Sequence, residues 1–310
     1  MSAPFERLAV LGLGLLGGSL ALAARRRGLA RAVVGGARRA DTRAAALAAG
    51  AVDEAADLDA AARGADLVVL ATPVFAMPEV LRRAAPGLAP GAIATDVGSV
   101  KGTLAEVLPG LLPTGARYVG SHPMAGSHHS GFEHAREDLF ENAVCIVDAS
   151  ADPDARERVC ALWRALGARV VLRDPARHDA EVAWMSHLPH LLAFAFAGAL
   201  RAAPAQAAEV AGPGFRDFTR IAHGEPELWA DILTANRKAL AAPLEAVGAA
   251  FREMTRAVEA NDAEALERWI GAARSALAPG GARGPGPAHD TRRTPDGACG
   301  RAGRGETSRT

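Results

Sequence analysis

Short apolar runs alternate with alanine-rich segments through the first half of the chain. Many of these runs are bounded by glycine, aspartate or proline, which predicts buried strands rather than helices. Strands are expected at 8–11, 32–35, 67–71, 92–95, 118–120, 143–147 and 169–172. Helices are expected between them, including 19–27, which Gly28 ends, and 154–166. Alternating strands and helices predict an α/β fold with a doubly wound parallel sheet.

From Pro175 the strand pattern stops, and apolar residues recur at helical spacing to about Leu277. Examples are Trp184, Leu188, Leu191, Leu192, Phe251, Met254, Val258, Leu266 and Trp269. These apolar faces exceed what one small helical domain can bury, so we expect an all-helical dimerisation domain and a homodimer. The predicted domains are 1–174 and 175–278. The remainder, 279–310, contains no Leu, Ile, Val, Met or aromatic residue and is expected to be a disordered tail.

Composition narrows the class of protein. The formal net charge is +0, from 35 basic and 35 acidic residues, so nucleic acid is not an expected partner. The cysteines, Cys145, Cys160 and Cys299, form neither a CxxC pair nor a disulfide framework. The first residues lack the basic region of a signal peptide, and the apolar stretch 188–200 is too short to cross a bilayer. We therefore expect a cytoplasmic protein without a membrane partner.

A glycine fingerprint, Gly12-x-Gly14-x-x-Gly17, follows the first strand and precedes the first helix. In this context Gly12 permits a tight turn, Gly14 lets the backbone approach a pyrophosphate, and Gly17 lets the helix pack on the strand. The pattern predicts a dinucleotide-binding domain of the Rossmann type. The cofactor-binding residues expected are Gly12, Gly14, Leu15, Leu16, Gly17, Arg38, Arg39, Thr72, Pro73 and Ser99.

The end of the second strand bears on the choice of dinucleotide. NAD enzymes usually carry an acid there for the ribose 2′-hydroxyl, whereas this chain reads Gly35-Gly36-Ala37-Arg38-Arg39. Arginine pairs with a 2′-phosphate and a carboxylate repels it, so NADP is favoured. NAD stays open as the alternative, because Asp41 could reach the ribose and the arginines could be a solvated helix start.

Candidate chemistry lies on two further segments at strand ends. His122 opens a decapeptide, 122–131, of mostly small residues and histidines after the fifth strand. An imidazole titrates near neutral pH, so His122 could accept a hydroxyl proton while hydride leaves for a nicotinamide. Ser99, after the fourth strand, could hydrogen-bond substrate, nicotinamide or this histidine. The structural alternative for Ser99 is a helix N-cap, and His128 and His129 could be plain loop residues.

Together these blocks resemble the prephenate/arogenate dehydrogenases of tyrosine biosynthesis. The matching blocks are 12–17, 96–101, 122–131, 186–190 and 214–220, and the resemblance extends from about 8 to 278. It implies a nucleotide-binding domain, a helical dimerisation domain, and oxidative decarboxylation of prephenate. It also implies that His122 takes the C4 hydroxyl proton, Ser99 orients it, and Arg220 binds a substrate carboxylate. The other substrate contacts it implies are Ser127, His128, His178, His190 and Arg216.

Several alternatives remain open at this stage. Arogenate carries an ammonium in place of the keto group, and a nearby carboxylate would favour it. The decapeptide contains no acid, so prephenate is favoured, although Glu133, just beyond the decapeptide, could reach the site. For His178 and His190 the alternative is a helix-packing role. A β-hydroxyacid dehydrogenase is a second enzyme class, and a nucleotide-sensing protein is a non-catalytic one. No metal is expected, because Pro189 separates His187 from His190 and no carboxylate is nearby in sequence.

Overall fold

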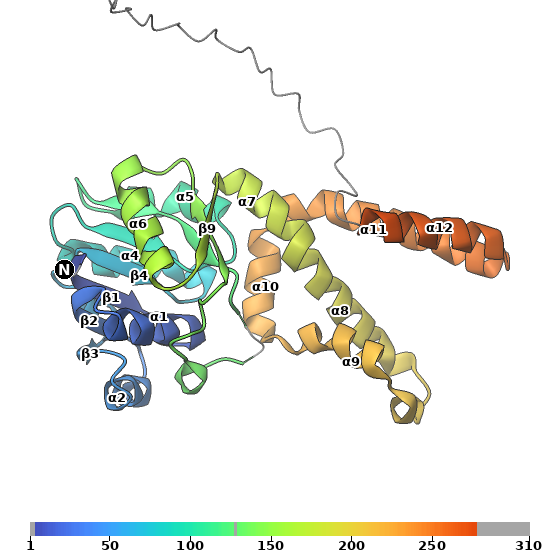
Figure 1. Cartoon of the computed structure of the whole chain (residues 1–310), viewed down its shortest axis with the longest axis horizontal. Helices are drawn as coiled ribbons and strands as arrows, with labels where there is room; N and C mark the ends of the chain where they lie inside the picture. Colours follow the sequence, from blue (N-terminus) through green and yellow to red (C-terminus); the bar gives the residue numbers. More distant parts are fainter. Residues whose placement is uncertain (1–3, 127–128, 278–310) are drawn as a thin grey trace, which may run out of the picture. The chain divides into compact units, whose positions relative to one another are not determined.

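The computed structural model describes residues 4–126 and 129–277, and they divide into two compact units at Val247 and Gly248. The first unit holds a six-stranded sheet with the order β3-β2-β1-β4-β5-β6, in which each neighbouring pair is parallel (Figure 1). Its strands are β1 Phe5–Leu11, β2 Ala30–Gly36, β3 Glu54–Ala56, β4 Leu67–Leu70, β5 Ile93–Asp96 and β6 Arg117–Val119. The predicted doubly wound parallel sheet is therefore confirmed.

Hydrophobic cores cover both faces of this sheet, which is why its strands are apolar throughout. Side chains alternate between the faces: Leu8 and Val10 of β1 enter one core, whereas Ala9 and Leu11 enter the other. The helices that follow the strands are α1 Leu15–Arg26, α2 Ala40–Ala48, α3 Leu58–Ala61, α4 Met77–Ala84 and α5 Gly102–Val107.

A second sheet follows, with three strands in the order β7-β8-β9. The strands are β7 Ser121–Pro123, β8 Val144–Asp148 and β9 Arg169–Arg173, and α6 Pro153–Ala165 connects the last two. β7 is antiparallel to β8, and β8 is parallel to β9. The sequence predicts His122 just after the fifth strand, but the residue lies within a further strand, β7, where it is paired with Ile146. That pairing joins segments far apart in the chain, so local pattern does not reveal it.

Helices make up the rest of the described chain. They are α7 Pro175–Val182, α8 Leu188–Ala199, α9 Pro213–Thr219, α10 Pro226–Ala235, α11 Arg237–Glu259 and α12 Ala263–Ala276. Short 3₁₀ turns occupy Val74–Ala76, Ala85–Gly87, Pro109–Leu111, Phe132–His134, Leu200–Ala202, Ala207–Val210 and Arg220–His223. The helices α7, α8 and α10 belong to the same compact unit as the sheets, and the predicted tail 279–310 lies outside the described residues.

A π-helical turn, Ala183–His187, joins α7 to α8 into one rod (Figure 1). Pro189 at the start of α8 has no N–H to donate, and a local π turn is one way in which a helix absorbs that loss. The helical run Pro175–Ala202 is long and apolar enough to cross a membrane by length and composition alone. The sequence predicts no membrane span, because the apolar stretch 188–200 alone is too short. The helix in the structure is longer, since it begins at Pro175. The buried His178 and His187 on this run show that its first half packs within the protein.

Candidate functional site

The glycine turn after β1 has the geometry that the fingerprint predicts. Gly12 adopts φ +110°, and a Cβ there would lie 2.4 Å from the Ala71 carbonyl oxygen. A Cβ on Gly17 would lie 1.9 Å from the Gly12 carbonyl oxygen, so larger residues are excluded at both positions. A Cβ on Gly14 would meet nothing within 4 Å. The backbone at Gly14 is therefore open to a ligand, next to the N-terminus of α1.

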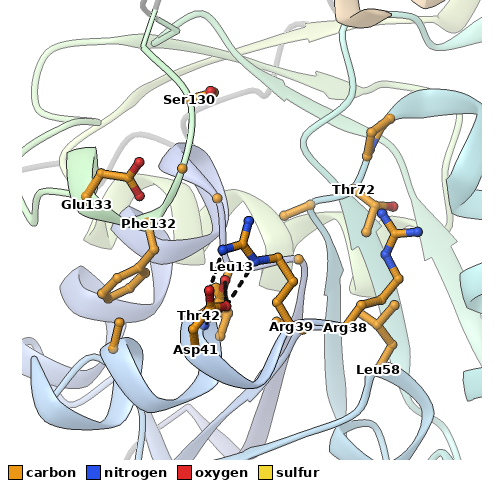
Figure 2. A pocket seen from close by; sticks show the side chains of 17 residues that line it. Leu13, Arg38, Arg39, Asp41, Thr42, Leu58, Thr72, Ser130, Phe132 and Glu133 are labelled. Carbon is orange, nitrogen blue, oxygen red and sulfur yellow. Dashed lines mark hydrogen bonds and ion pairs between the residues drawn. The ribbon is translucent and has the colours of Figure 1, made fainter.

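A cavity of about 650 Å³ lies beside this turn (Figure 2). Its walls come from the glycine turn, the ends of β2 and β4, and the segment 130–133; of the predicted cofactor residues it includes Gly12, Gly14, Arg38, Arg39, Thr72 and Pro73. The Thr72 hydroxyl is buried and has no partner within the described chain. An unsatisfied polar atom in such a wall fits a bound dinucleotide. Leu15 lines a neighbouring cavity of about 360 Å³, while Leu16, Gly17 and Ser99 line neither one.

Arg38, Arg39 and Asp41 line this cavity just after the end of β2. Arg39 Nε donates to Asp41 Oδ1 over 2.9 Å, and the two side chains form an ion pair (Figure 2). The hydrogen bond from Arg39, together with the Thr42 amide, lowers the pKa of Asp41 to about 2. Glu133, on another wall, acts electrostatically on Arg39. The cavity thus offers guanidinium groups that can bind a phosphate and a carboxylate that can accept a hydrogen bond from a ribose hydroxyl.

His122 lies at the centre of a buried histidine cluster. It is 6% exposed, and its Nδ1 lies 2.9 Å from Nε2 of His178, which is fully buried in α7. His178 Nδ1 in turn lies 2.8 Å from Asp179 Oδ1. Burial holds the pKa of His122 well below its ordinary value, and electrostatic interactions with His178, Lys101 and His187 lower it further. His122 is therefore neutral at pH 7 and can accept a proton.

An ion pair supports β7 from the parallel sheet. Asp96, at the end of β5, pairs with Lys101 and accepts hydrogen bonds from the Tyr118 hydroxyl at 2.9 Å and the Ser121 amide at 3.1 Å. Because Ser121 precedes His122 directly, these bonds hold the backbone of the histidine against the sheet. Ser99, in the same turn, is half-buried, and no hydrogen bond from its hydroxyl to His122 is present in the described residues. Its predicted orienting role stays a prediction.

Further histidines approach from the helical side. His187 is 1% exposed; its Nδ1 lies 2.8 Å from Asn236 Nδ2, and its Nε2 is buried without a hydrogen-bond partner in the described chain. Burial lowers the pKa of His187 to about 4. His190 stacks on Trp229 with ring centroids 3.8 Å apart. Burial also lowers the pKa of His190, and the nearby Arg220 lowers it further.

The predicted site residues thus fall into groups. His122 and His178 lie together; His190 and Arg220 lie together by their electrostatic coupling. Arg216 is exposed, and its guanidinium donates to the Ala211 carbonyl over 2.7 Å. Ser127 and His128 lie outside the described residues.

Other polar residues at the site were not predicted from the sequence. They are Asp96, Asp179, His187, Asn236 and Trp229. The adjacent His178-Asp179 pair and the acid that ends a strand, Asp96, are the signals that could have drawn attention to two of them. Nothing local distinguishes Asn236 from other helical asparagines.

Comparison with known proteins bears on this arrangement. Residues 20–172 match the family model "Prephenate dehydrogenase, nucleotide-binding domain", and residues 174–272 match "Prephenate dehydrogenase, dimerization domain". The prephenate dehydrogenase of Bacillus subtilis (strain 168) is 34% identical over 280 residues, which cover 87% of this chain and 74% of that protein.

Solved structures agree with the sequence matches. Prephenate dehydrogenase from A. aeolicus, in complex with hydroxyphenyl propionate and NAD+, superposes with a TM-score of 0.79 at 28% identity, covering 87% of this chain and 96% of that one. Synechocystis arogenate dehydrogenase superposes with a TM-score of 0.72 at 32% identity, covering 86% and 97%. The glycine turn, the buried histidine cluster and these matches together show that the chain belongs to the prephenate dehydrogenase family of oxidoreductases.

Proposed function

We propose that this protein is a prephenate dehydrogenase that converts prephenate to 4-hydroxyphenylpyruvate and CO₂, with NADP as the hydride acceptor. One observation carries the proposal. A buried, neutral imidazole, His122, begins the segment whose far end, Ser130 and Gly131, lines the dinucleotide cavity. We infer that this segment brings the proton acceptor beside the carbon that gives its hydride to the dinucleotide.

In this mechanism His122 accepts the C4 hydroxyl proton through its ring nitrogen. A dinucleotide held beside the glycine turn and Thr72 would supply the hydride acceptor for C4. The resulting dienone loses the ring carboxylate as CO₂, and the electron pair left behind makes the ring aromatic. The phenolate oxygen then takes back the proton that His122 held. Arg220, beside His190, pairs with a substrate carboxylate and holds the ring in place.

Prephenate is favoured over arogenate by the hydrogen bonds of Asp179, the acid that contacts the histidine cluster. Asp179 already accepts hydrogen bonds from His178 and from the amides of Lys101 and Gly102, so it is not free to bind an ammonium. The positive and neutral groups of the cluster suit a dianion better. Arogenate remains the second candidate, supported by the similarity to Synechocystis arogenate dehydrogenase.

The choice of NADP rests on Arg38 and Arg39 in the cavity wall. NAD is the second candidate, supported by Asp41 in the same wall and by the NAD+ in the A. aeolicus complex. The decisive experiment compares initial rates for prephenate and arogenate with each cofactor by absorbance of the reduced nicotinamide. We expect prephenate with NADP to give the highest kcat/KM. An absence of turnover in all combinations would refute the enzyme assignment.

The proposal includes a homodimer in the cytoplasm. Within the first compact unit, Met185 and Val210 are 77% and 85% exposed; within the second, Phe251, Val258 and Ile270 are exposed. Exposed apolar side chains in such numbers mark surfaces for interaction on each unit. The match to a dimerization-domain model supports a second copy as the occupant. Light scattering coupled to size-exclusion chromatography should give twice the 31.9 kDa mass of the chain, and a monomer would contradict this part of the proposal.

A further inference from the structure

Three side chains form a hydrogen-bonded line that starts in α7 and ends at the proposed proton acceptor. Asp179 Oδ1 lies 2.8 Å from His178 Nδ1, and His178 Nε2 lies 2.9 Å from His122 Nδ1. His178 is fully buried and His122 is 6% exposed, so water does not replace either contact. The position of the proton in one of these hydrogen bonds therefore determines its position in the next.

The first proton position follows from the Asp179 carboxylate. Its oxygens already accept the amide of Lys101 at 2.7 Å and the amide of Gly102 at 2.9 Å. Burial alone would raise the pKa of Asp179, but the hydrogen bonds from His178 and these amides outweigh it and lower the pKa. An ionised carboxylate only accepts hydrogen bonds, so the proton between Asp179 and His178 is on His178 Nδ1.

The second proton position follows from the first. Burial holds the pKa of His178 below its ordinary value in spite of the carboxylate, so its ring is neutral at pH 7 and Nε2 carries no proton. This bare Nε2 accepts a hydrogen bond from His122, which requires the His122 proton to be on Nδ1. His122 Nε2 is then unprotonated. If His178 were instead a cation, it would donate to His122 and force the proton of a neutral His122 onto Nε2, where it would block proton acceptance.

We propose that Asp179 and His178 are positioning residues that fix His122 in the tautomer with a bare Nε2, and that they stabilise the imidazolium formed when His122 takes the substrate proton. The inference rests on the proposed function, since it gives that function's base its proton-accepting form. Neither residue needs to touch substrate. Both act through the ring of His122, as a carboxylate does when it orients a catalytic imidazole.

Other charged groups around His122 do not set its tautomer. Lys101 and His187 interact with His122 electrostatically, and Lys101 forms an ion pair with Asp96. Lys101 is paired with Asp96, and His187 Nδ1 is engaged by Asn236. Only His178 is hydrogen-bonded to a His122 ring nitrogen in the described residues.

The test substitutes His178, because Asp179 also holds the first amides of α5 and its loss would disturb the fold. His178→Leu removes the acceptor for His122 Nδ1. His178→Gln keeps it, since a carboxamide can donate to Asp179 through nitrogen and accept from His122 through oxygen. Asp174→Ala is the matched structural control: it removes the N-cap of the same helix, where Asp174 accepts from the Arg177 amide at 2.9 Å, without touching the line.

For kinetics with prephenate and NADP, we expect His178→Leu to lower kcat by about 10²–10⁴-fold, with KM within about 3-fold. His178→Gln should recover most of that loss, and Asp174→Ala should keep kcat while lowering Tm. A His178→Leu enzyme with the wild-type kcat, or a His178→Gln enzyme as slow as His178→Leu, would overturn the inference.

A second measurement does not depend on turnover. In full-length protein labelled with ¹⁵N-histidine, long-range proton–nitrogen correlations report which ring nitrogen is protonated, and the His122 signal is identified by its loss in His122→Gln. We expect His122 protonated on Nδ1 at pH 7.5 in the wild type, and on Nε2 or mixed in His178→Leu. Protonation on Nε2 in the wild type would overturn the inference even if the enzyme is active. The expected tautomer in a protein that turns over neither prephenate nor arogenate would refute the proposed function alone.

Discussion

Lys101 and Asp96 form an ion pair inside the protein, with side chains only 3% and 0% exposed. Asp96 ends β5 and Lys101 precedes α5, so the pair closes the turn that contains Ser99. The same carboxylate accepts hydrogen bonds from the amide of Gly98 at 2.9 Å and from the amide of Ser121 at 3.1 Å. One buried anion thus joins the parallel sheet, the Ser99 turn and the strand that carries His122.

Lys101→Met should destabilise the protein by about 3–5 kcal/mol, because it leaves a buried carboxylate without its countercharge. Urea unfolding followed by circular dichroism measures the loss. The double variant Asp96→Asn/Lys101→Met should recover part of it. As a control, Glu79→Gln breaks the exposed Arg82–Glu79 pair and should cost less than about 1 kcal/mol. Similar losses at Lys101 and Glu79 would show that the interior pair is not a structural link.

His122→Gln should lower kcat with prephenate by about 10²–10⁴-fold, because it removes the imidazole that is proposed to accept the hydroxyl proton. The dissociation constant for NADP should stay within about 2-fold, since His122 does not line the 650 Å³ cavity. Steady-state kinetics and fluorescence titration measure the two quantities. An equally active variant would remove the basis for the proposed chemistry.

The parts of this fold that sequence predicts are those set by local physics. The glycine pattern is typical of a strand-loop-helix unit that binds a dinucleotide. The apolar runs of β1, β4 and β5 are typical of strands that are buried on both faces of a parallel sheet. β3, Glu54–Ala56, was missed because alanine and glutamate have low strand propensity; it exists through pairing with β2. β7 was missed for a similar reason, since β8 stabilises it.

The site divides along the same lines. His122 was predicted because it lies in a distinctive block at the edge where parallel sheets bind ligands. Asp179 was not, because its role depends on the contact between its neighbour His178 and His122, which are 56 residues apart in sequence. His187 and Asn236 are likewise brought together over 49 residues. Side-chain partners of this kind are a product of tertiary packing and have no local signature.

Stability should fall as the solution is acidified from pH 6.5 to 4.5. The pKa of His187 is about 4 in the folded protein against 6.5 when unperturbed, and those of His122 and His178 are also lowered. Over this interval the unfolded chain binds protons that the folded protein does not, so the unfolding free energy rises with pH and is lost on acidification. His187 alone contributes up to about 3 kcal/mol.

Urea midpoints at pH 7.5, 6.0 and 5.0 measure this dependence. The lowered pKa values of carboxylates such as Asp179 and Glu181 matter only below the interval. His187→Gln should flatten the profile. Constant stability between pH 7.5 and 5.0 would mean that these histidines are protonated as easily in the folded protein as in the unfolded one.

Cofactor preference should respond in opposite directions to the two members of the Arg39–Asp41 pair. Arg39→Ala removes a cation available to a 2′-phosphate and should lower the kcat/KM ratio of NADP to NAD by about 10-fold. Asp41→Ala removes an anion and frees Arg39, so the same ratio should rise. Initial-rate comparison with both cofactors tests this. A ratio that moves the same way in both variants would contradict a direct role for the pair.

Arg220→Ala should raise KM for prephenate by about 30-fold, or about 2 kcal/mol, with little change in NADP affinity. The physical reason is the loss of a guanidinium beside His190 that pairs with a substrate carboxylate. Arg216→Ala is the matched control, because that side chain is exposed in the same helical segment but donates to the Ala211 carbonyl. Its effect on KM should be less than about 3-fold. If both variants weaken prephenate equally, the segment contributes a diffuse positive field and Arg220 makes no specific contact. Arg220→Lys separates these cases further, since it keeps the charge but loses bidentate pairing and should recover only part of the affinity.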